Sequence, residues 1–108
     1  MPIDSIADLL AAYKRNFVPE RAAGINGTVQ LHLTGDDPGD HVLTFVDGTF
    51  EIAEGTIEDP TVAVTATSAD WIALSLGKAN PMMLMMGGKL KVKGSFALAT
   101  KFQSLFKS

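Results

Sequence analysis

The sequence has no cysteine, so the chain can form neither a disulfide nor a zinc site built on thiolates. A chain without cysteine is compatible with a reducing compartment. No apolar run approaches the roughly 18 residues that a membrane span needs. The first ten residues, MPIDSIADLL, carry acids where a secretory signal carries bases. We therefore expect no signal peptide and a cytoplasmic protein.

Acidic residues are missing from the last third of the chain. All twelve acids lie at or before Asp70, and residues 71–108 carry six lysines. Two interpretations stay open: two oppositely charged faces that attract each other, or a basic surface that makes transient contact with an anionic membrane or an acidic partner. On the second interpretation, the residues that face the membrane are Lys89, Lys91 and Lys93. Nucleic acid is not an expected partner, because the net charge is −3 and no aromatic residue stands among these lysines.

Groups for catalysis and metal binding are also scarce. The chain has two histidines: His32 falls on the polar face of a predicted strand, and His41 borders a turn. The pattern supplies neither a nucleophile with a base nor a metal with its ligands. The stretch GDDPGD holds three aspartates but lacks the spacing of an EF-hand loop, and Asx turns explain it better. We expect no enzyme activity from this chain alone, no catalytic residue, no metal and no cofactor.

The first two thirds of the sequence predict one helix and four strands. Residues 3–17 have apolar side chains at spacings of three and four, as in an amphipathic helix. Alternation of apolar and polar residues predicts a strand at residues 27–35. Residues 41–52 predict a hairpin that turns at Asp47-Gly48. The β-branched residues of DPTVAVTAT, at residues 59–67, predict a fourth strand.

The last third predicts three helices and one more strand. TSAD at residues 67–70 resembles a capping box and opens a helix. Asn80-Pro81 is a second start signal, for a short methionine helix that Gly87-Gly88 ends. KLKVKG, at residues 89–94, alternates like a strand, and a final amphipathic helix follows. We expect one domain over residues 1–108, of the α+β class, in which helices gather on one face of a sheet.

The methionine helix is apolar on every side. It contains Met82, Met83, Met85 and Met86 together with Leu84, and successive residues of a helix turn by about 100°. Such a helix is either buried all round or faces something apolar. Methionine suits varied apolar partners, because its unbranched side chain reshapes easily. Core, ligand cavity and protein interface all remain open at this point.

The stretch GKANPMMLMMGGKLKVKG, followed by LATKFQSLF, closely resembles the signature of the sterol carrier protein 2 domain family. The resemblance spans nearly the whole chain. It implies a five-stranded, mainly antiparallel sheet covered on one face by helices, with an apolar tunnel between the two layers. In that tunnel the domain would hold a fatty acyl chain, a fatty acyl-CoA, a sterol or a phospholipid, without catalysing a reaction.

The resemblance also suggests which residues contact the lipid. The methionine helix and the last helix would form the lid and wall, Trp71 and Leu74 would line the tunnel, and inward strand residues would form its floor. The full set is Phe17, Leu31, Leu33, Phe45, Trp71, Leu74, Met82, Met83, Met85, Met86, Leu90, Phe102 and Phe106. The alternative is an accessory interaction or dimerisation module of a lipid-modifying or quinone-biosynthesis enzyme. The methionine surface would then pack against a partner, or against a second copy in a homodimer.

Overall fold

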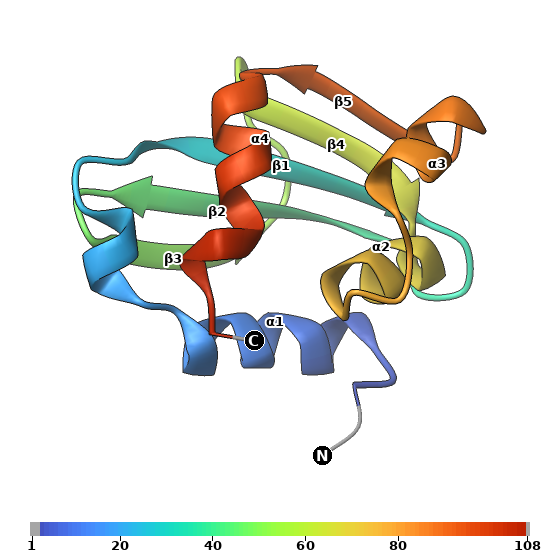
Figure 1. The fold of residues 1–108 in the computed structure, drawn as a ribbon, viewed down its shortest axis with the longest axis horizontal. Helices are drawn as coiled ribbons and strands as arrows, with labels where there is room; N and C mark the ends of the chain where they lie inside the picture. Colours follow the sequence, from blue (N-terminus) through green and yellow to red (C-terminus); the bar gives the residue numbers. More distant parts are fainter. Residues whose placement is uncertain (1–2, 108) are drawn as a thin grey trace.

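The computed structural model describes residues 3–107 and contains the elements in the expected order. The α-helices are α1 (Ile6–Asn16), α2 (Ser68–Ser75), α3 (Pro81–Met86) and α4 (Phe96–Phe102). The strands are β1 (Asn26–Thr34), β2 (Gly39–Val46), β3 (Thr49–Glu54), β4 (Val62–Thr67) and β5 (Leu90–Gly94). Two short 3₁₀ helices, η1 (Pro19–Ala22) and η2 (Gln103–Leu105), follow α1 and α4. Figure 1 shows these elements along the chain.

Local sequence signals explain where the elements turn and begin. Asp47 and Gly48 have φ angles of 40° and 87°, as the two central residues of a type I′ hairpin turn require. The Thr67 hydroxyl accepts a hydrogen bond from the Asp70 N–H and so caps α2. The Asn80 side chain does the same for α3, where Pro81 occupies the first helical position.

The five strands form one sheet in the order β3-β2-β1-β4-β5. Neighbouring strands pair antiparallel except β1 and β4, which are parallel. The expected mainly antiparallel α+β fold is therefore confirmed. The strand order also requires the connection at residues 55–61 to cross β2 and β1.

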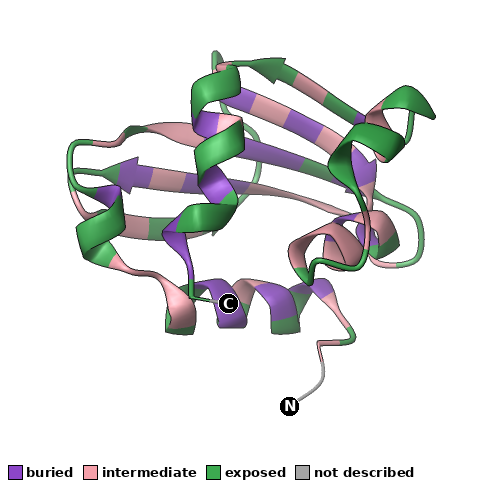
Figure 2. Ribbon diagram, viewed as in Figure 1, coloured by how far each residue is buried: buried purple, intermediate pink, exposed green. Residues whose placement is uncertain are grey.

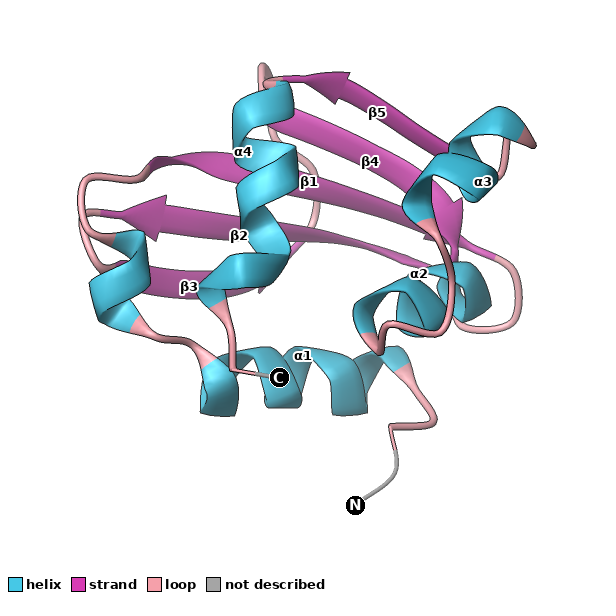
Figure 3. Ribbon diagram, viewed as in Figure 1, coloured by secondary structure: helices cyan, strands magenta, loops and turns pink. Residues whose placement is uncertain are grey.

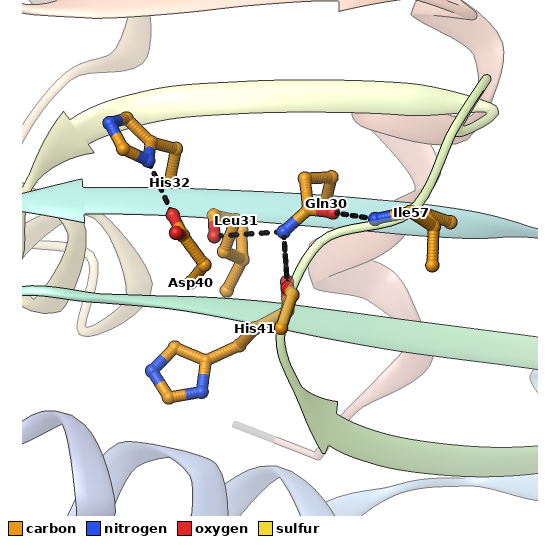
Figure 4. Close-up of polar contacts among 7 residues, drawn as sticks. Gln30, Leu31, His32, Asp40, His41 and Ile57 are labelled. Atoms are coloured by element: carbon orange, nitrogen blue, oxygen red, sulfur yellow. Dashed lines mark hydrogen bonds and ion pairs between the residues drawn. The ribbon is translucent and has the colours of Figure 1, made fainter.

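Gln30 fastens this crossing segment to the sheet. Its amide nitrogen donates to the Gly55 carbonyl oxygen at 2.9 Å. The same nitrogen donates to the His41 carbonyl oxygen at 3.2 Å, and the amide oxygen accepts from the Ile57 N–H at 2.9 Å (Figure 4). Gln30 alternates along β1 with Val29 and Leu31, which face the helices. The crossing segment thus lies on the sheet face opposite the helices, which leaves the helix-covered face for the core.

The helices gather on one face of the sheet (Figure 3). Beneath them, the side of the sheet that contains β2 and β3 is filled by rings. We call this group the aromatic cluster. It consists of Tyr13, Phe17, Phe45, Phe50, Phe102 and Phe106, whose neighbouring ring centroids lie 4.7–6.5 Å apart. The rings interlock at the spacing of aromatic pairs, so this half of the core is closely packed.

Candidate functional site

The other half of the same sheet face, over β4 and β5, is hollow. A cavity of about 260 Å³ lies there between the sheet and helices α2, α3 and α4. Its floor is made of strand residues: Val29, Val62, Val64, Leu90 and Val92. Its wall and rim come from the helices: Trp71, Leu74, Pro81, Met85, Phe96, Ala99, Thr100, Phe102 and Gln103. We call this space the apolar cavity.

The lining of the apolar cavity suits hydrocarbon. Thr100 and Gln103 contribute the polar side chains, together with the indole N–H of Trp71. The Thr100 hydroxyl donates to carbonyl oxygens of its own helix at 2.8 and 3.1 Å, so its proton is already used. Among residues 3–107, none that lines the cavity carries a charge. Burial of an apolar chain in this space is favourable, because it removes apolar surface from water on both sides.

The rim of the cavity is apolar and exposed to solvent. Phe96, at the start of α4, is 61% exposed, and Met82, Met83 and Met86 of α3 are 66%, 70% and 85% exposed. Figure 2 shows α3 as an exposed helix at the edge of the molecule, next to β5. The core interpretation of these three methionines is therefore wrong, since α3 contains no buried residue. We call Met82, Met83, Met86 and Phe96 the exposed apolar patch.

The sequence-predicted lipid-contacting residues fall into three groups in the structure. Trp71, Leu74, Met85, Leu90 and Phe102 line the apolar cavity. Met82, Met83 and Met86 lie outside it on the exposed side of α3. The remaining five do not line the apolar cavity but belong to the packed core: Phe17, Leu31, Leu33, Phe45 and Phe106. Of these, Phe106 also borders a second hollow.

Sequence reasoning missed most of the cavity floor. Val29, Val62, Val64 and Val92 lie on it, although alternation had already placed Val29 and Val92 on apolar strand faces. The missing information was the strand order, which puts β4 and β5 under the gap between α3 and α4. Valine matters there because its short side chain leaves space above the sheet that a phenylalanine would fill.

The lysines of β5 point away from the apolar cavity. Lys91 and Lys93 are exposed and alternate with the cavity residues Leu90 and Val92, so they project from the opposite sheet face. Because β5 is an edge strand, lysines there also prevent pairing with a strand of another molecule. Lys89, in the turn between α3 and β5, lies next to the exposed apolar patch in sequence.

A second hollow of about 450 Å³ lies on the other side of Leu74 and Gln103, which line both spaces. It is bordered by α1, the end of α2 and the C-terminal segment, including Tyr13, Asn16, Ser75 and Lys107. The Tyr13 hydroxyl and Ser75 Oγ are hydrogen-bonded at 2.8 Å. Burial raises the pKa of Tyr13 to about 12, against smaller lowering effects of Ser75 and Trp71. This hollow is therefore more polar than the apolar cavity.

Neither histidine lines either hollow. His32 is paired with Asp40 on the sheet face opposite the helices (Figure 4). Within residues 3–107, no group of three or more histidines, cysteines and acidic residues is arranged to hold a metal ion. None of the helices in that range is long and apolar enough to cross a membrane.

Comparison with known proteins identifies relatives over nearly the whole chain. The family model described as the SCP-2 sterol transfer family matches residues 6–107. Hydroxysteroid dehydrogenase-like protein 2 of Xenopus laevis is 28% identical over 101 residues, which cover 93% of this chain and 24% of that protein. The chain thus spans about a quarter or less of the length of the first curated relatives that it matches.

Two solved structures share the fold at lower sequence identity. The palmitated SCP2L2 of Aedes aegypti superposes with a TM-score of 0.69 at 21% identity, covering 96% of this chain and 93% of that one. The inverting sec-alkylsulfatase Pisa1 of a Pseudomonas species superposes with a TM-score of 0.80 at 22% identity. There the match covers 94% of this chain and 16% of the sulfatase. This fold therefore occurs both as most of a chain and as a small part of a longer one.

Proposed function

Because the chain belongs to the SCP-2 sterol transfer family, we propose that it is a non-catalytic lipid carrier that holds one hydrocarbon chain in the apolar cavity. The observation that carries this proposal is an uncharged cavity bounded by valines, Trp71, Met85 and Phe102. A palmitated relative with the same fold supports an alkyl chain as the ligand. The candidates are a fatty acyl chain, a fatty acyl-CoA, a sterol and a phospholipid.

The size of the cavity favours a single flexible chain over a rigid ring system. Its volume of about 260 Å³ lies just below the range of ligand sites, which usually measure roughly 300–1,000 Å³. An alkyl chain follows a narrow space by rotating its bonds, whereas a sterol skeleton does not. Met85 and Phe96 at the rim can move aside to admit it, because one is flexible and the other is largely exposed.

The expected affinity follows from the buried chain. Each buried methylene contributes about 0.8 kcal/mol, so sixteen carbons give a gross transfer free energy on the order of 12 kcal/mol. Immobilising the alkyl chain and ordering the rim side chains offset several kcal/mol of this gain. We expect dissociation constants in the micromolar to high-nanomolar range.

The direct test is mass spectrometry of an organic extract from the purified protein, together with native mass spectrometry of the intact protein. We expect co-purified lipid with at least one long alkyl chain. We also expect quenching of Trp71 fluorescence on titration with hexadecanoate, since Trp71 lines the cavity and is the only tryptophan. An empty protein that does not take up hexadecanoate would reject the proposal.

As part of the carrier function, we propose that α3 docks onto a membrane. The exposed apolar patch lies at the rim of the cavity, and Lys78 and Lys89 flank α3 in sequence. Each lysine near an anionic membrane contributes about 1 kcal/mol. Residues 71–108 contain no acid that would oppose this attraction.

Vesicle sedimentation tests this docking. The protein should bind phosphatidylglycerol vesicles better than phosphatidylcholine vesicles, and added salt should weaken the binding. A Met83→Ser/Met86→Ser variant should bind less. Val46→Ser is the matched control, because Val46 is 54% exposed on β2, outside the patch. Equal binding by all three proteins would reject docking through α3.

The second candidate function is an accessory interaction or dimerisation module. The same exposed apolar patch favours it, as does the occurrence of this fold within a much longer sulfatase. On this alternative the patch packs against an enzyme or against a second copy. Light scattering and methionine oxidation together distinguish the module from the carrier. A tight homodimer in which the patch is protected from oxidation supports the module. A monomer whose methionines are readily oxidised supports the carrier. The cytoplasmic location expected from the sequence stays a prediction.

A further inference from the structure

The two borders of the sheet differ in how they are protected. In the order β3-β2-β1-β4-β5, β3 and β5 each pair with one strand, so each presents unpaired backbone groups on its other side. β5 carries Lys91 and Lys93, which discourage pairing with a further strand, whereas β3 carries no lysine. Figure 1 shows β3 at the border of the sheet on the side where α1 lies. β3 is therefore the border that is open to another strand.

The register of β2 and β3 shows which backbone groups of β3 are free. Opposite residues of antiparallel strands alternate between pairs that exchange hydrogen bonds and pairs that do not. The Gly55 N–H donates to the Asp40 carbonyl oxygen at 2.9 Å, so every second pair from there is bonded. These pairs are Ala53 with Val42, Glu51 with Thr44, and Thr49 with Val46. The N–H and C=O groups of Phe50, Ile52 and Glu54 consequently point away from β2.

A third hollow, of about 330 Å³, lies along this border of the sheet. We call it the β3 groove. It is lined by residues of α1, β2 and β3: Lys14, Thr44, Phe50, Glu51, Ile52 and Ala53. Its volume lies within the range of ligand sites, roughly 300–1,000 Å³. Extended peptides bind beside an open sheet edge by adding a strand, because main-chain hydrogen bonds hold them and alternate side chains give specificity.

The side chains of β3 differ between the two faces of the sheet. Phe50 and Ile52 are half-buried on the helix-covered face, in register with Phe45 and Leu43. Glu51 alternates with them and is exposed on the opposite face. A strand added beside β3 places its own side chains next to those of β3 on each face. A matching strand therefore carries apolar side chains on the helix-covered face and cations on the opposite face.

The charges around the β3 groove also oppose other occupants. Two β3 strands paired about a two-fold axis would bring Glu51 close to the Glu51 of the second copy, and like charges across a strand pair are destabilising. Glu54 and Asp47 add negative charge at the two ends of β3. Lys14 lines the groove from α1 and so opposes a cation on the helix-covered face. A cation is favoured on one face of the added strand and an apolar side chain on the other.

We propose that β3 is the docking edge for an extended segment of a partner protein, in which lysine or arginine alternates with apolar residues. The segment adds to β3 as a sixth strand and bonds to the outward N–H and C=O groups of Phe50 and Ile52. Its cations lie beside Glu51, and its apolar side chains extend the layer of Phe50 and Ile52. The apolar cavity lies at the opposite border of the sheet, over β4 and β5, so this docking is independent of lipid binding.

The test uses two synthetic peptides and ¹⁵N-labelled protein. The first peptide is acetyl-Thr-Lys-Val-Lys-Val-Lys-Thr-amide, and the second has glutamate in place of each lysine. NMR titration gives the affinity of each peptide, and amide hydrogen exchange shows where it binds. We expect the lysine peptide to bind more tightly and to slow exchange at Phe50 and Ile52, whose N–H groups are free without it. The amides of Glu51 and Ala53 should change little, because they already bond to β2.

A charge reversal in β3 sharpens the test. Glu51→Lys should weaken binding of the lysine peptide by about fivefold and favour the glutamate peptide, because an exposed ion pair is replaced by a repulsion. Added salt should reduce both effects. Glu58→Lys is the matched control, because Glu58 is exposed in the crossing segment and does not line the β3 groove. It should bind the lysine peptide within about twofold of the wild type.

Four outcomes would overturn this docking edge. No binding of the lysine peptide rejects it outright. Equal affinity for both peptides, or equal effects of Glu51→Lys and Glu58→Lys, rejects the charge match. Exchange slowed in α3 in place of β3 puts the peptide on the exposed apolar patch. A homodimer in light scattering, with slow exchange at Phe50 and Ile52 before peptide is added, assigns the edge to a second copy. None of these bears on the carrier function, which the hexadecanoate titration tests separately.

Discussion

The two halves of the helix-covered sheet face have the same chemistry but different shapes. Over β2 and β3, the rings of the aromatic cluster pack against one another, with Phe45 and Phe50 stacked at 4.9 Å. Over β4 and β5, the strands present Val62, Val64 and Val92, and the apolar cavity remains. Apolar content alone therefore does not distinguish core from binding site. What distinguishes them is the volume of the side chains that face each other between the sheet and the helices.

Helix α4 joins the two halves. Phe102 contacts Tyr13, Phe45 and Phe106 in the aromatic cluster and also lines the cavity. Phe96, six residues earlier, is largely exposed at the cavity rim. One end of the helix is thus anchored in a rigid core, while the other borders a space with few contacts. Local opening needs little free energy where few buried contacts are lost, so we expect α3 and the start of α4 to open before the rest.

The largest effect should come from Phe45→Ala in the packed half. Phe45 is fully buried among four other rings, and removing it leaves a cavity that rigid neighbours cannot fill. We expect a loss of about 3–5 kcal/mol in the free energy of unfolding, measured by urea denaturation. Phe96→Ala, its counterpart at the rim, should cost less than about 0.5 kcal/mol and instead weaken lipid binding. Similar losses of stability in both variants would mean that the two halves are packed alike.

A smaller effect is expected for Tyr13, whose ring belongs to the aromatic cluster and which also borders the second hollow. Its pKa is about 12 in the folded protein, against 10.0 as the ordinary value. The unfolded chain therefore loses this proton first, and the stabilisation is fully present below pH 10 and lost as the pH rises to 12. Two pKa units correspond to about 2–3 kcal/mol. Urea denaturation at pH 9 and pH 12 should show this extra loss in the wild type relative to Tyr13→Phe, and equal losses would contradict a buried phenol.

The next smaller effect on stability is expected from Val64→Phe, which adds a ring to the cavity floor. Val64 is 5% exposed, but the space above it is open, so the ring can enter without displacing neighbours. We expect stability to change by less than about 1 kcal/mol while hexadecanoate affinity falls tenfold or more. Leu43→Phe is the counterpart in the packed half, where overpacking costs about 1–3 kcal/mol. Unchanged affinity in Val64→Phe would place the ligand elsewhere.

Much of this fold was predictable because its signals are local. The Asp47-Gly48 turn, the Thr67 and Asn80 caps and the alternation along β5 each depend on a few neighbouring residues. The strand order was not predictable in this way. The parallel pair of β1 and β4 depends on the crossing segment that Gln30 fastens, and this contact joins residues 27 positions apart.

The same contrast between local signals and non-local packing explains which site residues were predicted. Trp71, Leu74 and Met85 lie on elements named by the family signature or next to it, and they line the cavity. Leu31 and Phe45 were placed on the correct sheet face, but both are fully buried in the packed core, Phe45 as part of the aromatic cluster. Sequence periodicity assigns a residue to a face of a sheet. It does not say whether the layer above that residue is filled.

The smallest effect on stability should come from Met83→Lys in α3. Met83 is 70% exposed, so the ammonium group reaches water and the change in the free energy of unfolding should stay within about 0.5 kcal/mol. Met85→Lys is the comparison variant with the larger expected effect on binding. Met85 is half-buried and lines the cavity, where a charge is costly to desolvate. We expect hexadecanoate affinity to fall strongly in Met85→Lys and by less than about threefold in Met83→Lys, measured by Trp71 fluorescence. If Met83→Lys destabilised the protein like Phe45→Ala, α3 would belong to the packed core, and the division of this sheet face into a filled half and an open half would be wrong.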